Sequence, residues 1–323
     1  MLSVFLNFYR MRWVHPGFFF NLFFLFLKWF YRSRGIELEF RPRQFKAANL
    51  IKQGKKTSSA SSEASVDLYM LASEKDIECL DITLPFAYRS VAGLSISRSV
   101  LVVPDSIVQK VRHILAGLSL NIQVWPESSV VSYSDLSVIK SHFGERSGWV
   151  YQQTLKLALL QNCPTQYVLI VDSDTVLLNP REWVKADGSV ALTPTEEFND
   201  AYFHFLEKLG SLPVTPRTSF IPHHMFYEVS SFRKLTLQLK IENTFQVIKK
   251  INDHSDVSTS SPFSLDYELY AQWSLSKLNS KVRLIRWSNI SVSRSKLDFF
   301  RKHPRFLLLL RFFYNSISFH SWN

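Results

Sequence analysis

The sequence predicts an α/β fold with a mainly parallel sheet flanked by helices, preceded by a hydrophobic and basic N-terminal extension. Three observations support this prediction. Between residues 66 and 180, short apolar runs typical of strands alternate with longer runs of helical periodicity. This alternation favours parallel pairing, because the chain crosses back over the sheet between strands. The composition, 46% hydrophobic and 20% charged, is that of a globular chain and not of a disordered one.

The expected elements follow one another at regular spacing in the first half of the domain. The second half is less regular, with a strand at 189–197, a strand, loop and helix across 219–239, and a helix at 264–278. The expected strands of the first half are Ser65–Ser73, Ser99–Asp105, Asn121–Glu127 and 167–174, and the expected helices between them are 74–91, 106–118 and Gly148–Asn162.

Composition also divides the chain into three parts. Residues 1–35 are a hydrophobic, basic, membrane-associating segment, residues 36–65 a basic and Ser-rich linker, and residues 66–323 the folded domain. The most hydrophobic stretch, "GFFFNLFFLFLKWFY" (Gly17–Tyr31), contains Asn21 and Lys28. A spanning helix needs about 20 apolar residues, so this stretch is interpreted as an interfacial anchor, with a short signal anchor as the alternative.

The net charge of +11 is concentrated at the two ends of the chain. Residues 1–56 carry eleven Lys and Arg against two Glu, and residues 294–311 carry six against one Asp. Basic ends that are also rich in Phe and Leu favour an anionic membrane surface over a nucleic acid. We therefore expect the protein at the cytoplasmic face of a membrane, peripheral or monotopic. Two cysteines are too few for a disulfide framework and form no metal-binding spacing.

The segment "YVLIVDSDTVLLNP" (Tyr167–Pro180) places two carboxylates inside an apolar strand. Buried charges are costly unless they meet a cation or hydrogen-bond donors, so Asp172 and Asp174 are candidate ligands. They could hold a divalent cation against a diphosphate at the carboxyl edge of the sheet. They could also be the first motif of a haloacid-dehalogenase-type phosphatase with Asp172 as nucleophile, or caps of a turn. The phosphatase motif normally opens its domain, whereas about a hundred residues precede it here.

Five segments in one order resemble the GT-A-type glycosyltransferases, which carry a D-x-D motif. The resemblance covers about residues 66–322. Within the family, the five segments look most like a bacterial polysaccharide-associated branch of uncharacterised transferases. It implies a Rossmann-like GT-A fold, a nucleoside-diphosphate sugar as donor, Mn²⁺ or Mg²⁺, and a glycan or lipid-linked acceptor. A non-catalytic membrane-associated module with the same fold is the alternative. The five segments are "YMLASEKD", "GWVYQQTLKL", "YVLIVDSDTVLLNP", "FIPHHMFYE" and "FSLDYELY".

The same resemblance implies roles for particular residues. Asp266 or Glu268 would be the general base if the reaction inverts configuration. Asp172 and Asp174 would hold the metal, with His320 as third ligand. Gln152 and Lys156 share a helix face and would approach the diphosphate. The residues implied to contact the donor are Ala72, Ser73, Lys75, Asp76, Gln152, Gln153, Lys156, Asp172, Ser173 and His224.

Overall fold

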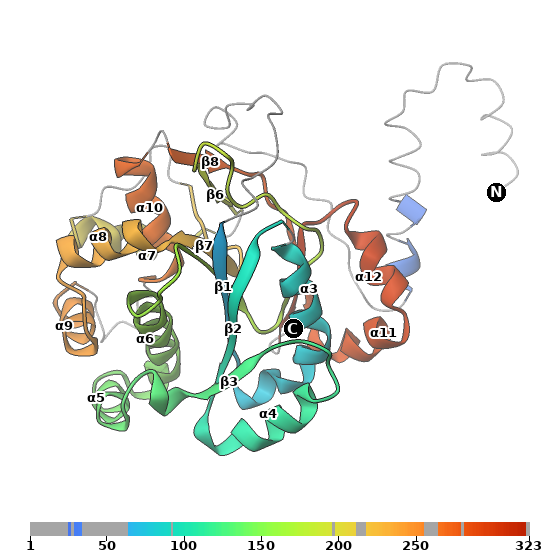
Figure 1. Ribbon diagram of the computed structural model, residues 1–323, viewed down its shortest axis with the longest axis horizontal. Coiled ribbons are helices and arrows are strands. Elements are labelled where there is room, and N and C mark those ends of the chain that lie inside the picture. The colour runs from blue at the N-terminus through green and yellow to red at the C-terminus, as the bar shows by residue number, and fades with distance from the viewer. Residues whose placement is uncertain are drawn as a thin grey trace, which may run out of the picture.

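A five-stranded sheet lies at the centre of the protein, with strand order β3-β2-β1-β4-β7 (Figure 1). The computed structural model describes residues 25–26, 29–33, 64–91, 93–195, 198–210, 218–254, 264–278 and 281–320. Most of the predicted membrane-associating segment and nearly all of the predicted linker lie outside these residues. The strands are β1 (Ser65–Leu71), β2 (Ser95–Val103), β3 (Gln123–Pro126), β4 (Tyr167–Asp172) and β7 (His224–Glu228).

The pairing of these strands confirms the predicted α/β class with a mainly parallel sheet. β1 pairs in parallel with β2 on one side and with β4 on the other, β2 pairs in parallel with β3, and β7 is antiparallel to β4. The chain therefore changes direction across the sheet between β1 and β4. Ligands of open α/β sheets bind at such a switch point, outside the carboxyl ends of the strands. Register places Leu71 of β1 beside Asp172 of β4 at this edge.

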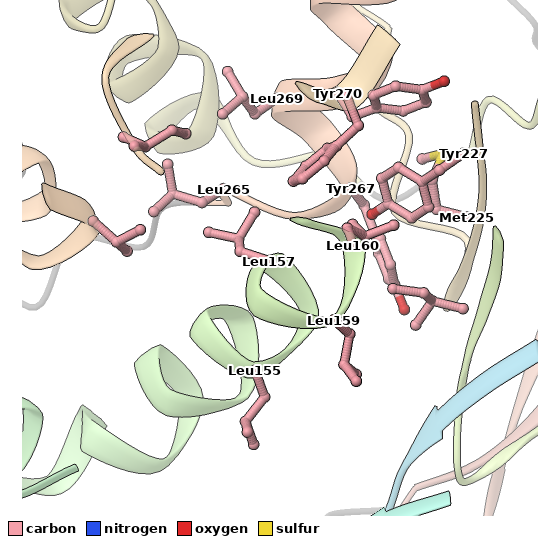
Figure 2. Close-up of a cluster of buried hydrophobic side chains, with 14 of the residues drawn as sticks. Leu155, Leu157, Leu159, Leu160, Met225, Tyr227, Leu265, Tyr267, Leu269 and Tyr270 are labelled. Carbon is pink, nitrogen blue, oxygen red and sulfur yellow. The ribbon is translucent and has the colours of Figure 1, made fainter. Parts of the chain in front are cut away.

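Helices cover both faces of the sheet because successive strand residues point to opposite sides. Leu68 and Met70 of β1 pack with α3 (Leu80–Ser90) and α4 (Val108–Leu115). Tyr69 and Leu71 pack in a second core with helices of the other face. Figure 2 shows part of that core. Its helices include α5 (Tyr133–Phe143), α6 (Ser147–Gln161), α8 (Val229–Leu239), α9 (Thr244–His254) and α10 (Tyr267–Lys277).

Two small sheets extend the structure beyond the carboxyl edge. In the first, β10 (Ser316–His320) pairs antiparallel with β5 (Thr175–Leu177) and parallel with β9 (Asn289–Ser293). The second pairs β6 (Val190–Leu192) with β8 (Val282–Leu284). Because β5 directly follows the D-x-D turn, its pairing with β10 brings the C-terminal strand to that turn. The remaining helices are α7 (Asp200–Lys208), α11 (Leu297–Lys302) and α12 (Pro304–Leu310).

Most of the expected elements are present within a few residues of their predicted bounds. The predicted helix over 74–91 is a 3-10 turn, Glu74–Cys79, followed by α3, and β2 begins four residues earlier than expected. Pairing along β1 extends the second strand, because Ser95 lies opposite Ser65. Within the described residues, no helix is both long and apolar enough to cross a membrane.

Candidate active site

The D-x-D turn joins the central sheet to the smaller sheet of β5 and β10. Asp172 is the last residue of β4, and its backbone N–H donates to the carbonyl of His223 at 2.9 Å. The carbonyl of Asp174 accepts from the N–H of Phe319 at 2.8 Å. Ser173, between them, is buried. The two carboxylates are therefore held on a turn whose backbone is fixed by neighbours from two distant parts of the chain.

Lys156 of α6 lies between two carboxylates. Its Nζ is 3.0 Å from Asp172 Oδ1 and 3.0 Å from Asp266 Oδ2, and the side chain is buried. Burial alone would lower the pKa of this amine, but Asp172 and Asp266 together raise it above its ordinary value. The Nζ also lies 4.1 Å from the centre of the Tyr267 ring. Lys156 is thus a fixed positive charge beneath the D-x-D turn.

Asp172 is ionised because of the donors around it. Tyr267 donates its hydroxyl to Asp172 Oδ1 at 2.7 Å, and His223 Nδ1 lies 3.5 Å from Oδ2. Burial would raise the pKa of this carboxyl, but Lys156, His223 and Tyr267 outweigh it and hold the pKa well below its usual range. Both oxygens of Asp172 therefore have partners within the protein.

Asp174 and His320, which were both predicted as metal ligands, lie close together across the turn. His320 Nδ1 lies 3.3 Å from Asp174 Oδ2, and the rings of His320 and His223 are 5.1 Å apart. Carboxylate oxygen and imidazole nitrogen are suitable donors for Mn²⁺, and carboxylate oxygen for Mg²⁺. In the described part of the chain, no three His, Cys, Asp or Glu side chains form a preassembled metal centre. The donor types fit a divalent cation, while the Asp172 carboxylate is paired with Lys156.

The two adjacent histidines have different surroundings. His223 has a φ of 63°, a conformation that non-glycine residues seldom adopt, and its ring lies beside Asp172 and His320. His224 is fully buried, and its ring packs against Trp183 and Trp287. Burial lowers the pKa of His224 to about 3, so this imidazole is neutral. His223, and not His224, therefore has its imidazole beside the D-x-D carboxylates.

The two acids predicted as alternative bases also separate. Asp266 lies in the site, where Oδ2 pairs with Lys156 and Oδ1 accepts from Ser264 at 3.0 Å. Glu268 is fully enclosed, and one oxygen accepts from the Ser219 hydroxyl and the Phe220 N–H, both at 2.9 Å. Burial raises the pKa of Glu268 to about 7, although these hydrogen bonds oppose the shift. Glu268 thus fixes the segment that leads to His223.

The residues around position 73 that were predicted to contact the nucleotide of the donor follow the end of β1. The N–H of Ala72 donates to the carbonyl of Val102, and the Ser73 hydroxyl donates to Asp76 at 2.6 Å. Asp76 forms an ion pair with Arg294 at 2.7 Å, whereas Lys75 is exposed. Ala72 and Ser73 follow the strand next to β4, so they lie on the same edge of the sheet as the D-x-D turn.

The two glutamines of α6 differ in position. Gln153 is buried, and its side-chain oxygen accepts from the N–H of Leu265 at 2.7 Å, directly before Asp266. Its amide nitrogen has no hydrogen-bond partner among the described residues. Gln152 is half-buried. Gln153 therefore supports the loop that carries Asp266.

Three residues of this region were not predicted from the sequence. Tyr267 stands between the two predicted acids in "LDYEL", yet only the structure shows its hydroxyl on Asp172. His223 has the same local sequence signal as His224. Arg294 is 218 residues from Asp76 in the chain, and only the tertiary fold brings the two side chains together.

The chain resembles one sequence family and several solved structures. Residues 73–193 match the model of a family of unknown function (DUF6492). No curated protein matches the sequence. Solved structures that resemble this fold include mouse xyloside xylosyltransferase 1 in its apo form, at 10% identity and a TM-score of 0.47, over 80% of this chain and 98% of that chain.

Two further solved structures are similar at comparable identity. The galactosyltransferase LgtC in complex with donor and acceptor sugar analogs is 13% identical with a TM-score of 0.43, over 78% of this chain and 86% of that one. The apo structure of the bifunctional glycosyltransferase WbbM is 12% identical with a TM-score of 0.41, over 80% of this chain and 46% of that one. No activity is assigned to the DUF6492 family, whose function is unknown.

Proposed function

We propose that this protein is a metal-dependent glycosyltransferase that moves a sugar from a nucleoside-diphosphate sugar to a glycan or lipid-linked acceptor. The observation that supports this most directly is the convergence of Asp172, Asp174, Lys156 and His320 at the switch point of the sheet. Strand β1, which leads to Ala72 and Ser73, is the immediate neighbour of β4. A nucleotide bound on this edge would have its diphosphate beside the D-x-D turn.

The charge of the site supports metal dependence. Two carboxylates, those of Asp172 and Asp266, share one lysine, Lys156, and a third, that of Asp174, lies two residues further along the turn beside His320. An anionic diphosphate would be repelled by this excess of negative charge unless a divalent cation accompanied it. Asp174 and His320 would hold the cation together with Asp172 Oδ2. When bound, the metal would neutralise charge on the leaving nucleoside diphosphate.

The chain's own residues would then position the substrates. Lys156 keeps Asp172 ionised and oriented. Tyr267 donates its hydroxyl to the same carboxylate, and its ring also contacts Lys156 Nζ. Asp266 is the acid that reaches the site, so we assign it the role near the acceptor hydroxyl if the reaction inverts configuration. Glu268 is a positioning residue for the segment before His223.

We propose the acceptor and the location from the composition of the two ends of the chain. Both ends are basic and rich in Phe and Leu, which suits the anionic cytoplasmic face of a membrane. Lipid-linked acceptors are held at such surfaces. The proposal therefore places a nucleotide-sugar donor on the sheet edge and a glycan or lipid-linked acceptor at the membrane side.

The test measures the binding of UDP and GDP, with and without Mn²⁺, by thermal unfolding and by calorimetry. We expect stabilisation that needs nucleotide and metal together and that Asp174→Asn abolishes. Asp253→Asn, at an exposed ion pair of α9, is the matched control and should behave as the parent. An Asp174→Asn protein that keeps the full metal-dependent shift would refute the assignment. An aspartyl-phosphate on Asp172 would identify a phosphatase instead, and no nucleotide binding at all a non-catalytic module.

A further inference from the structure

The N-terminal aromatic segment packs against the C-terminal helices, although some 275 residues separate them. Tyr31 is fully buried and donates its hydroxyl to the carbonyl of Phe306 in α12 at 2.7 Å. The ring of Phe30 stacks on the ring of Phe306, with centres 4.6 Å apart. In Figure 1 this blue segment lies beside α12. The described residues of the N-terminal part therefore pack directly on α12 of the C-terminal part.

Large apolar side chains remain exposed in the N-terminal segment and directly after α12. Leu25, Phe26 and Trp29 are helical residues with exposed fractions of 60, 55 and 66%, and Phe312, after α12, has 56%. Leu25 and Trp29 are four residues apart and so share a helix face, while Tyr31 points into the core. Aromatic side chains clustered in this way mark interaction sites when they are rimmed by polar groups.

Exposed basic side chains lie on the same segments of the chain as these aromatic groups, and Arg311 lies over the ring of Phe312. Arg32, Lys302, Arg305 and Arg311 are exposed, and none has an ion pair among the residues that the structure describes. The acid on α11, Asp298, is already paired with Arg301. The surface thus presents unbalanced positive charge together with aromatic rings, the combination that binds the headgroup region of anionic bilayers.

We propose that residues 25–26 and 29–33, α12 and Arg311–Phe312 form one docking surface for an anionic lipid bilayer, called here the aromatic–basic surface. Trp29 and Phe26 would enter the interfacial region, where amphipathic aromatic rings are favoured. Arg305 and Arg311 would meet lipid phosphates as delocalised, bidentate donors. A bilayer fits better than a folded protein partner, because long basic side chains on an apolar surface can extend toward headgroups.

The aromatic–basic surface is connected to the candidate active site. Phe300 of α11 packs on Phe319, with ring centres 5.6 Å apart, and Phe319 is the neighbour of His320 in β10. Arg294, before α11, bonds both Asp76 and the carbonyl of Phe319. A bilayer bound to this surface would therefore lie next to the helices that pack on β10, the strand that carries the predicted metal ligand His320. Only the presentation of a lipid-linked acceptor rests on the proposed function; vesicle binding itself does not.

The first test measures co-sedimentation of the full chain with phosphatidylcholine vesicles, with and without phosphatidylserine. We expect binding that needs phosphatidylserine and weakens with salt. Arg305→Gln with Arg311→Gln should weaken it about 30-fold, from about 1 kcal/mol for each basic residue near the membrane. The matched control, Lys110→Gln with Lys140→Gln, alters exposed lysines of α4 and α5 and should leave binding unchanged. Equal binding by both double variants would overturn the proposal.

The second test reports insertion directly. Cys79 and Cys163 are buried, so a single added cysteine can be labelled selectively with an environment-sensitive dye. A label at Trp29→Cys should shift to the blue with anionic vesicles, while one at Phe245→Cys, an exposed position of α9, should not. An unchanged label at residue 29 would overturn the proposal. Vesicle binding without transferase activity would support the docking surface and refute the proposed function. Transferase activity without vesicle binding would support the proposed function and refute the docking surface.

Discussion

Replacing Lys156 with methionine keeps most of the side-chain volume and removes the positive charge between Asp172 and Asp266. Nζ lies 3.0 Å from each carboxylate, and the Lys156 side chain is only 5% exposed. Each of these contacts is a charge-assisted hydrogen bond, worth about 1.5–3 kcal/mol in a folded protein. Asp172 would keep Tyr267 and His223 as partners, so part of the loss is offset.

The expected loss of folding free energy is therefore about 3–5 kcal/mol at pH 7, the range for removing one partner of a buried pair. The loss should depend on pH. In the parent, the depressed pKa of Asp172 contributes stability above the unfolded pKa of about 3.9, and this contribution is lost as pH falls below it. Without Lys156 much of that contribution is absent at every pH. The gap between parent and variant should narrow below about pH 4.

Urea unfolding at pH 7 and at steps down to pH 3 measures both effects. Lys110→Met, on the exposed side of α4, is the matched control and should change stability by less than about 0.5 kcal/mol. If Lys156→Met costs less than about 1 kcal/mol at pH 7, or if its cost is the same at pH 3, the ion pairs do not have the energetic role assigned here. A double variant with Asp266→Asn should recover part of the loss, because one uncompensated carboxylate is gone.

Two further predictions concern Tyr267 and Glu268, which both lie on α10. Tyr267→Phe removes the hydroxyl that donates to Asp172 and should cost about 1.5–3 kcal/mol in urea unfolding, with no change in secondary structure by circular dichroism. Glu268 has a folded pKa raised to about 7, so the folded state keeps a proton that the unfolded state releases, and stability should fall by about 3 kcal/mol as pH rises from about 4.5 to about 7. Glu268→Gln should remove that pH dependence, and an unchanged pH profile would contradict the buried environment described for this acid.

The sequence predicted the elements whose signal is local. β1, β4 and α6 were found because an apolar run or a helical period lies within one window of the chain. The D-x-D pair was found because charge inside an apolar strand is energetically unusual. α9 was missed although Val247, Ile248 and Ile251 have helical spacing, because a short amphipathic helix among loops is weak against that background.

The rest of the site depends on long-range packing that a single sequence does not encode visibly. His223 and His224 are neighbours with the same chemistry, and only the positive φ of His223 turns one ring to Asp172 and leaves the other in the core. Asp266 and Glu268 differ in the same way. From sequence the two acids are equal candidates, whereas in the structure Asp266 pairs with Lys156 and Glu268 accepts a hydrogen bond from the N–H of Phe220.

The two carboxylates of the D-x-D turn have different partners, and this difference bears on what each can do. Asp172 has a permanent internal cation in Lys156, so its charge is largely balanced before any ligand arrives. Asp174 contacts His320 and the hydroxyl of Thr175 and forms no ion pair with a Lys or Arg among the described residues, although the Arg294 guanidinium, which pairs with Asp76, also acts on it through space. A positively charged ligand should therefore gain more from Asp174 than from Asp172. Loss of metal binding should be larger for Asp174→Asn than for Asp172→Asn, whereas loss of stability should follow the opposite order.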